Sequence, residues 1–163
     1  GRPVTSRIVT VSGDDVKEPG NFKVLIGTNQ KEVVDAAGGF IGEAEKVISG
    51  GPMMGFAMFT LDTPITKTSS SILCMTNDAV AAHEPSACIN CGRCVDACPS
   101  RIIPSRLADY AERFNEEAFV KWEGMECVEC GCCSYVCPAK RQLKQSIGSM
   151  KKIVIANRKK RGN

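Results

Sequence analysis

Eight of the ten cysteines fall into two groups that share one spacing, which is the strongest chemical signal in the sequence. Each group reads C-x2-C-x2-C-x3-C-P. The members are Cys88, Cys91, Cys94 and Cys98 in the first group, and Cys127, Cys130, Cys133 and Cys137 in the second. Three thiolates at this spacing can wrap three corners of an iron–sulfur cubane. The sequence therefore predicts a metal site and no catalytic residue.

This run is typical of two-cluster bacterial ferredoxins, in which the fourth cysteine ligates the other cluster. We therefore predict two [4Fe-4S] clusters with crossed ligands. The predicted ligands are Cys88, Cys91, Cys94 and Cys137 for cluster 1, and Cys127, Cys130, Cys133 and Cys98 for cluster 2. We also expect each fourth thiol to open a helix that points at the neighbouring cluster, with Pro99 and Pro138 redirecting the chain.

Structural zinc and disulfides are the competing interpretations of these cysteines. Zinc sites usually take four ligands in two pairs, which fits the repeated run poorly. No secretory signal is visible, and a reducing cytoplasm keeps thiols free to bind metal. Cys132 breaks the spacing and is interpreted as a free thiol beside a cluster, while Cys74 lies in an apolar run and is expected in the core.

Composition narrows the class of protein further. The 163 residues are 43% hydrophobic, which is in the globular range. No apolar run approaches the roughly 18 residues that span a bilayer, so we expect no transmembrane segment and at most a peripheral membrane association. The chain starts at Gly1 without Met and continues directly into a strand-like run, which suggests a fragment or a processed chain.

The formal charge of +3 is unevenly distributed. Residues 151–163 carry six basic residues and no acidic one, and two anionic clusters would bring the folded protein to about −1. A nucleic-acid partner is therefore not expected. The basic tail is interpreted as a frayed end, although an acidic protein or anionic lipid headgroups could bind it.

The first half alternates strand-like runs with turn signals. Strands are expected over Arg7–Asp15, Asn21–Gly27, Ala44–Gly51 and Pro64–Met75, and one short helix is expected after the N-cap Asn29. This order favours a small mixed sheet around one helix. The loop SGGPMMG lacks the Lys and Ser/Thr of a phosphate-binding loop and is interpreted as a turn, with close approach to a partner domain as the alternative.

The second half is expected to be helical. One helix is predicted around Leu107, a second runs from the cap Asn115 to Trp122, and a last one places Leu143, Ile147 and Met150 on one face. The predicted segments are 1–76 for the sheet domain, 77–87 for a linker, 88–150 for the two-cluster domain and 151–163 for the tail.

Several stretches together resemble the C subunit of the Rnf complex, a membrane-bound, ion-translocating ferredoxin:NAD+ oxidoreductase. They are GRPVTSRIVTVSG, SGGPMMG followed by LDTPITK, and the two cysteine runs with a helical insert between them. The resemblance implies an α+β chain, with a soluble-ligand-binding β-grasp (SLBB) domain before a helical two-cluster ferredoxin domain. It also implies a place on the cytoplasmic side of the cell membrane, beside the other Rnf subunits and, indirectly, ferredoxin.

One part of the family pattern is missing. The family has a Rossmann-like portion with a Gly-rich flavin and nicotinamide site, so FMN and NAD(H) are expected on a part of the protein that lies outside this sequence. The chain alone then holds two one-electron relays and no hydride site. A cobalamin reductase, which is a soluble relative, and an independent ferredoxin carrier are the alternatives, although a diffusing carrier needs no docking domain.

Overall fold

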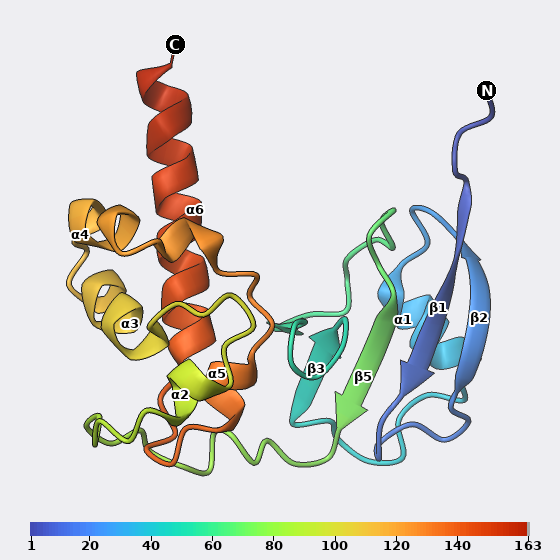
Figure 1. Cartoon of the computed structure of the whole chain (residues 1–163). Helices are drawn as coiled ribbons and strands as arrows, with labels where there is room; N and C mark the ends of the chain where they lie inside the picture. The colour runs from blue at the N-terminus through green and yellow to red at the C-terminus, as the bar shows by residue number, and fades with distance from the viewer. Residues whose placement is uncertain (163) are drawn as a thin grey trace. The chain divides into compact units, whose positions relative to one another are not determined.

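The computed structural model describes residues 1–162, in which the chain forms two compact units. The first unit ends at Ala82 and the second begins at His83, inside the segment expected as a linker. The first unit combines a sheet with one helix and the second is helical (Figure 1). This confirms the α+β class, while the four segment bounds given above remain a prediction.

The first unit is built on a five-stranded mixed sheet. Its strands are β1 (Ser6–Ser12), β2 (Gly20–Leu25), β3 (Lys46–Ser49), β4 (Phe56–Met58) and β5 (Ser71–Met75). Their order in the sheet is β2-β1-β5-β3-β4, with β1 and β5 parallel and every other pair antiparallel. β4 was not predicted from the sequence, because a three-residue strand with two exposed residues leaves no alternation of apolar and polar positions to detect.

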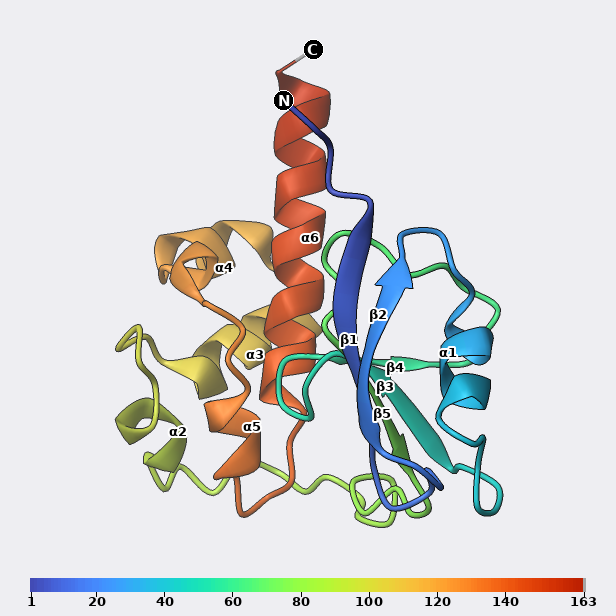
Figure 2. The same ribbon diagram turned by 90° about the vertical axis from the view of Figure 1, so that its right-hand side faces the viewer.

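The single helix of this unit, α1 (Gln30–Ala36), covers one face of the sheet (Figure 2). It begins as predicted, because the side chain of Asn29 accepts a hydrogen bond from the backbone N–H of Lys31. The core between helix and sheet consists of Val9, Val11, Val16, Val33, Val34, Ala37, Ile65, Ile72 and Cys74. Cys74 is fully buried there, which confirms its interpretation as a core residue.

The SGGPMMG loop joins β3 to β4 and forms the predicted turn. A side chain at Gly55 would place its Cβ 2.6 Å from the carbonyl oxygen of Gly51, so the loop packs against its own backbone too closely for any other residue. Met53 and Met54 remain largely exposed. Their expected contact with a partner domain stays a prediction.

The second unit consists of short helices around one long helix. Its elements are α2 (Arg93–Asp96), α3 (Pro104–Glu112), α4 (Glu116–Lys121), the 3-10 turn η1 (Gly124–Glu126), α5 (Cys132–Tyr135) and α6 (Leu143–Arg161). Asn115 caps α4 as predicted, accepting from the N–H of Ala118 at 3.0 Å. The apolar faces of α3 and α6 meet in a core that includes Leu107, Phe119 and Ile147.

The basic tail is helical as far as Arg161, so the expectation of a frayed end was wrong for residues 151–161. Val154 is fully buried, and Asn157 donates a hydrogen bond to Glu116 of α4 at 2.7 Å. The basic residues of the last turn also complement the partial negative charge at a helix C-terminus. Beyond α4 the helix extends past the rest of its unit (Figure 1). Within residues 1–162, no helix is long and apolar enough to cross a membrane.

Candidate iron–sulfur centres

The two cysteine runs adopt the same backbone conformation. Positive φ angles occur at matching positions: 56° at both Asn90 and Glu129, and 78° and 85° at Gly92 and Gly131. Each glycine precedes a four-residue helix, α2 or α5, that carries the third cysteine of its run. At each glycine a left-handed residue adjoins a right-handed helix, and such a change of hand can turn successive backbone N–H groups toward one side, as at anion and iron–sulfur sites. This backbone conformation is compatible with a negatively charged group in the loop.

The first run forms a cavity together with the last cysteine of the second run. This cavity has a volume of about 230 Å³ and is lined by thiols from both runs. The four cysteines that line it are Cys88, Cys91, Cys94 and Cys137. They are the four residues predicted as the ligands of cluster 1.

The second run forms a narrower cavity, of about 20 Å³, together with the last cysteine of the first run. The cysteines that line it are Cys98, Cys127, Cys130 and Cys133, the predicted ligands of cluster 2. A cavity of this size has room for about one water, so a cluster would require these side chains to move apart. Among residues 1–162, no three His, Cys, Asp or Glu side chains are arranged to hold a single metal ion.

The fourth cysteine of each run does not open a helix, contrary to the expectation from the sequence. Cys98 follows α2 and Cys137 follows α5, each after the helix has ended. The N–H groups of these two residues donate to the carbonyl oxygens of Val95 and Ser134, which closes the last turn. Each fourth thiol therefore reaches the other cavity from the C-terminal end of a short helix, just before a proline.

Burial makes the inner thiols weak acids. It raises the pKa of the Cys133 thiol to about 11, and it also raises the pKa of Cys127. A thiol must lose its proton before it can ligate iron, so the bonds to metal have to offset this cost. Thiols in such surroundings are unreactive without metal and are protonated at neutral pH.

Cys132 lines neither cavity in the part of the chain that the structure describes. The pKa of the Cys132 thiol is raised, mainly by a side-chain hydrogen bond with Cys130. Its interpretation as a free thiol beside a cluster remains a prediction.

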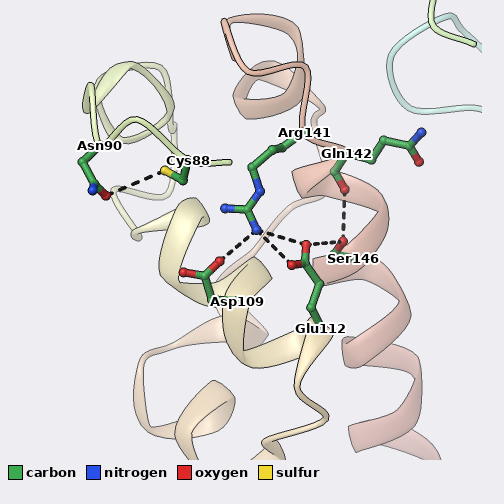
Figure 3. A network of polar contacts seen from close by, with 7 residues as sticks. All are labelled: Cys88, Asn90, Asp109, Glu112, Arg141, Gln142 and Ser146. Atoms are coloured by element: carbon green, nitrogen blue, oxygen red, sulfur yellow. Dashed lines mark hydrogen bonds and ion pairs between the residues drawn. The ribbon is translucent and has the colours of Figure 1, made fainter. Parts of the chain in front are cut away.

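A polar network supports the wall of the wider cavity (Figure 3). Arg141, which lines this cavity, donates hydrogen bonds to Asp109 at 2.8 Å and to both carboxylate oxygens of Glu112 at 3.0 and 3.1 Å. Ser146 of α6 donates to the same Glu112. The network joins the segment after Pro138 to α3 and α6 and matches the arginine charge with two carboxylates. This network was not predicted from the sequence, because residues 29 to 34 positions apart carry no local pattern.

Comparison with known families gives two matches in this order along the chain. Residues 8–57 match the SLBB domain, and residues 87–140 match the 4Fe-4S dicluster domain. The second match contains all eight cysteines of the two runs. The chain is therefore an iron–sulfur protein in which an SLBB domain precedes a dicluster domain.

Three relatives share one description, the C subunit of an oxidoreductase complex. The relative from the Na(+)-translocating ferredoxin:NAD(+) oxidoreductase complex of Acetobacterium woodii is 46% identical over 98% of this chain and 36% of its own length. The relative from the proton-translocating complex of Clostridium ljungdahlii is 49% identical over 93% of this chain and 33% of its own length. The relative from the ion-translocating complex of Methanosarcina acetivorans is 40% identical over 69% of this chain and 25% of its own length.

The chain belongs to the family of Rnf complex C subunits, which confirms the resemblance seen in the sequence. It spans about a third of the length of the two relatives that match nearly all of it.

Proposed function

We propose that this chain is the electron-relay portion of a membrane-associated ferredoxin:NAD+ oxidoreductase. In this role two [4Fe-4S] clusters pass single electrons between a flavin and NADH site and the other iron–sulfur subunits. The observation that carries the proposal is the sharing of cysteines between the two cavities, each of which is lined by three thiols of one run and the fourth of the other. Four thiols around each of two sites are the donor set that two cubanes require.

The proposed ligands are Cys88, Cys91, Cys94 and Cys137 for cluster 1, and Cys127, Cys130, Cys133 and Cys98 for cluster 2. When bound, the clusters supply one-electron redox chemistry at low potential. The chain would hold the clusters through these thiols, two of which, Cys94 and Cys133, belong to the apolar core formed with α3 and α6. FMN and NAD(H) would bind to a part of the protein outside this chain, where two-electron hydride transfer would take place.

The partners in this proposal are the other members of the complex, with ferredoxin reached indirectly. The names of the relatives describe subunits of ion-translocating complexes, which supports this assignment. The chain would act on the cytoplasmic side of the cell membrane, as a peripheral part of the complex. The relatives differ in the ion named for their complexes, which is sodium for one and the proton for the other.

An anaerobic redox assay tests the relay. The reconstituted chain should contain about eight iron and eight sulfide, and dithionite should bleach its thiolate-to-iron absorbance. With NADH and an artificial acceptor it should show no turnover until a flavin-containing portion is supplied. Stoichiometric zinc without iron would contradict the cluster assignment, and NADH oxidation by the chain alone would contradict the relay.

A further inference from the structure

Lys151 contacts the second cysteine run. It lies on α6, its side chain is only 16% exposed, and its ammonium donates a hydrogen bond to the backbone carbonyl of Cys127. Its neighbour Lys152 is exposed, as are Lys159 and Lys160 further along the helix. Lys151 therefore differs from the rest of the basic tail, because its charge is fixed beside a predicted cluster ligand and is partly removed from water.

Glu129 is the counter-charge of this lysine. It sits within the second cysteine run, where its backbone N–H donates to the sulfur of Cys127 at 3.4 Å and its carboxylate lies 3.7 Å from the ammonium of Lys151. Gly148, one helical turn before Lys151, provides the room, since a Cβ there would lie 2.9 Å from Oε2 of Glu129. Glu129 thus lines the narrower cavity, and Lys151 is bonded to the backbone of Cys127, another residue of its lining.

Both charges act on the sulfur of Cys127. The ammonium of Lys151 is bonded to the carbonyl of Cys127, and Glu129 is bonded to the sulfur of Cys127 through its N–H, so both charged residues contact the same residue. A change that adds negative charge at this sulfur is therefore favoured by the lysine charge and opposed by the glutamate charge. One-electron reduction of a bound cluster is such a change, because it makes the cluster and its thiolates more negative.

The geometry points to Lys151 as the residue that raises the reduction potential of cluster 2, with Glu129 limiting that effect. This inference rests on the proposed function, because it requires a cluster on Cys98, Cys127, Cys130 and Cys133. The step is a one-electron transfer in which the donor loses one electron and the cluster gains it. No bond to carbon or hydrogen breaks, and Lys151 keeps its proton throughout. Lys151 is thus a positioning charge and does not react.

Arg141 at the wider cavity is compensated differently from Lys151, although Arg106 also lines that cavity and Lys144 lines the narrower one. Arg141 is matched by two carboxylates at 2.8 and 3.0 Å, whereas Lys151 is opposed by one carboxylate at 3.7 Å. A positive charge with weaker compensation leaves a stronger field at the neighbouring sulfur. Substitutions at Lys151 and Glu129 should therefore move the potential of one cluster and leave the other nearly unchanged.

Redox titration of the reconstituted full chain, followed by electron paramagnetic resonance, tests this inference. Lys151→Met should change the reduction equilibrium of one cluster about tenfold. For one electron this lowers the midpoint potential of that cluster by about 59 mV. Glu129→Gln should raise the same midpoint, and Lys151→Arg, which keeps the charge, should leave it near the wild-type value. Lys152→Met removes the same charge from an exposed neighbour, where water and salt screen it, and should change the equilibrium less than about twofold.

The opposite signs separate an electrostatic role from a structural one, because damage to the fold would lower iron content in both variants without moving the midpoints apart. If Lys151→Met loses its cluster, the increase in midpoint potential expected for Glu129→Gln still tests the inference. Full iron content with midpoints that do not move, or that move in the same direction, would overturn the inference and leave the proposed function intact. A wild-type chain that holds no iron would overturn both.

Discussion

The two units of this chain differ in what stabilises them. The core of the first is a continuous set of aliphatic side chains between α1 and the sheet, and its one cysteine, Cys74, is buried among them as a small apolar residue. In the second, Cys94 and Cys133 belong to the core itself, and Cys98 packs against it with further cysteines. The core of the first unit therefore contains no predicted metal ligand, whereas the second includes predicted ligands in its core.

Helix length reinforces this contrast. Both α2 and α5 have four residues, and α4 has six. Isolated helices shorter than about 12 residues are marginal in water, so helices of this length depend on tertiary links. Eight thiolate bonds to two clusters would provide those links, which makes metal binding part of the folding free energy of the second unit.

The largest effect should therefore come from removing iron with a chelator. We expect the second unit to lose most of its helicity from His83 onward while the sheet of the first unit persists. Hydrogen exchange with mass spectrometry would show amides of α3 exchanging at nearly unfolded rates and amides of β1 and β5 still protected. Equal loss of protection in both units would contradict the comparison.

Exchanging single cysteines should have the next largest effect. Cys98→Ser should reduce the iron from about eight to about four per chain by removing cluster 2, and Cys137→Ser should remove cluster 1. Thiol alkylation would identify the lost cluster, because Cys130, which is only partly buried, should become reactive in Cys98→Ser while Cys88 stays protected. Cys132→Ser is the matched control and should keep both clusters. Loss of the cluster in the same run as the substitution would contradict the crossed ligands.

A matched pair of core substitutions should destabilise one unit at a time, with a smaller effect than the loss of a cluster. Ile72 and Ile147 are both almost fully buried, one in each core. Replacing either with Ala should destabilise its own unit by about 2–5 kcal/mol. Ile72→Ala should lower the thermal midpoint of the sheet unit and leave the absorbance of the clusters unchanged. Ile147→Ala, which alters the wall of the narrower cavity, should instead speed cluster loss.

The smallest effect concerns acid stability of the first unit. Two hydrogen bonds donated by Thr76, first from its hydroxyl and second from its backbone N–H, lower the pKa of Asp14. A lowered pKa stabilises the fold above the ordinary carboxyl pKa, and that contribution is lost as the pH falls through the lower, folded value. Asp14→Asn should therefore slightly reduce the thermal midpoint at pH 7 and flatten its decline in acid. A steeper decline of the thermal midpoint in acid for Asp14→Asn would contradict the lowered pKa of Asp14.

The sequence predicted those features that depend on local spacing. The cysteine register, the N-caps Asn29 and Asn115 and the apolar face of α6 all follow from residues a few positions apart. β4 was missed because Phe56–Met58 becomes a strand only through pairing with β3. The tail was misjudged because the contacts that order it, at Val154 and Asn157, come from α4 and the core of the second unit.

The arrangement of the site was predictable only in part. The pairing of each run with the last cysteine of the other followed from a known motif. The short helix of each run was expected after the fourth cysteine, whereas it begins at the residue just before the third. Lys151 and Glu129 gave no signal in the sequence, because they lie far apart along the chain and a basic tail usually faces solvent.

Cys91 is the one exposed thiol among the eight predicted ligands. With clusters in place, the corner of the cubane bound to Cys91 would be the part of either centre nearest to water. A partner that exchanges electrons could approach closest there, and so could dissolved oxygen and peroxide, because exposure governs oxidation of sulfur ligands. The same opening would thus serve as the electrical contact of the relay and as the place where air first damages it.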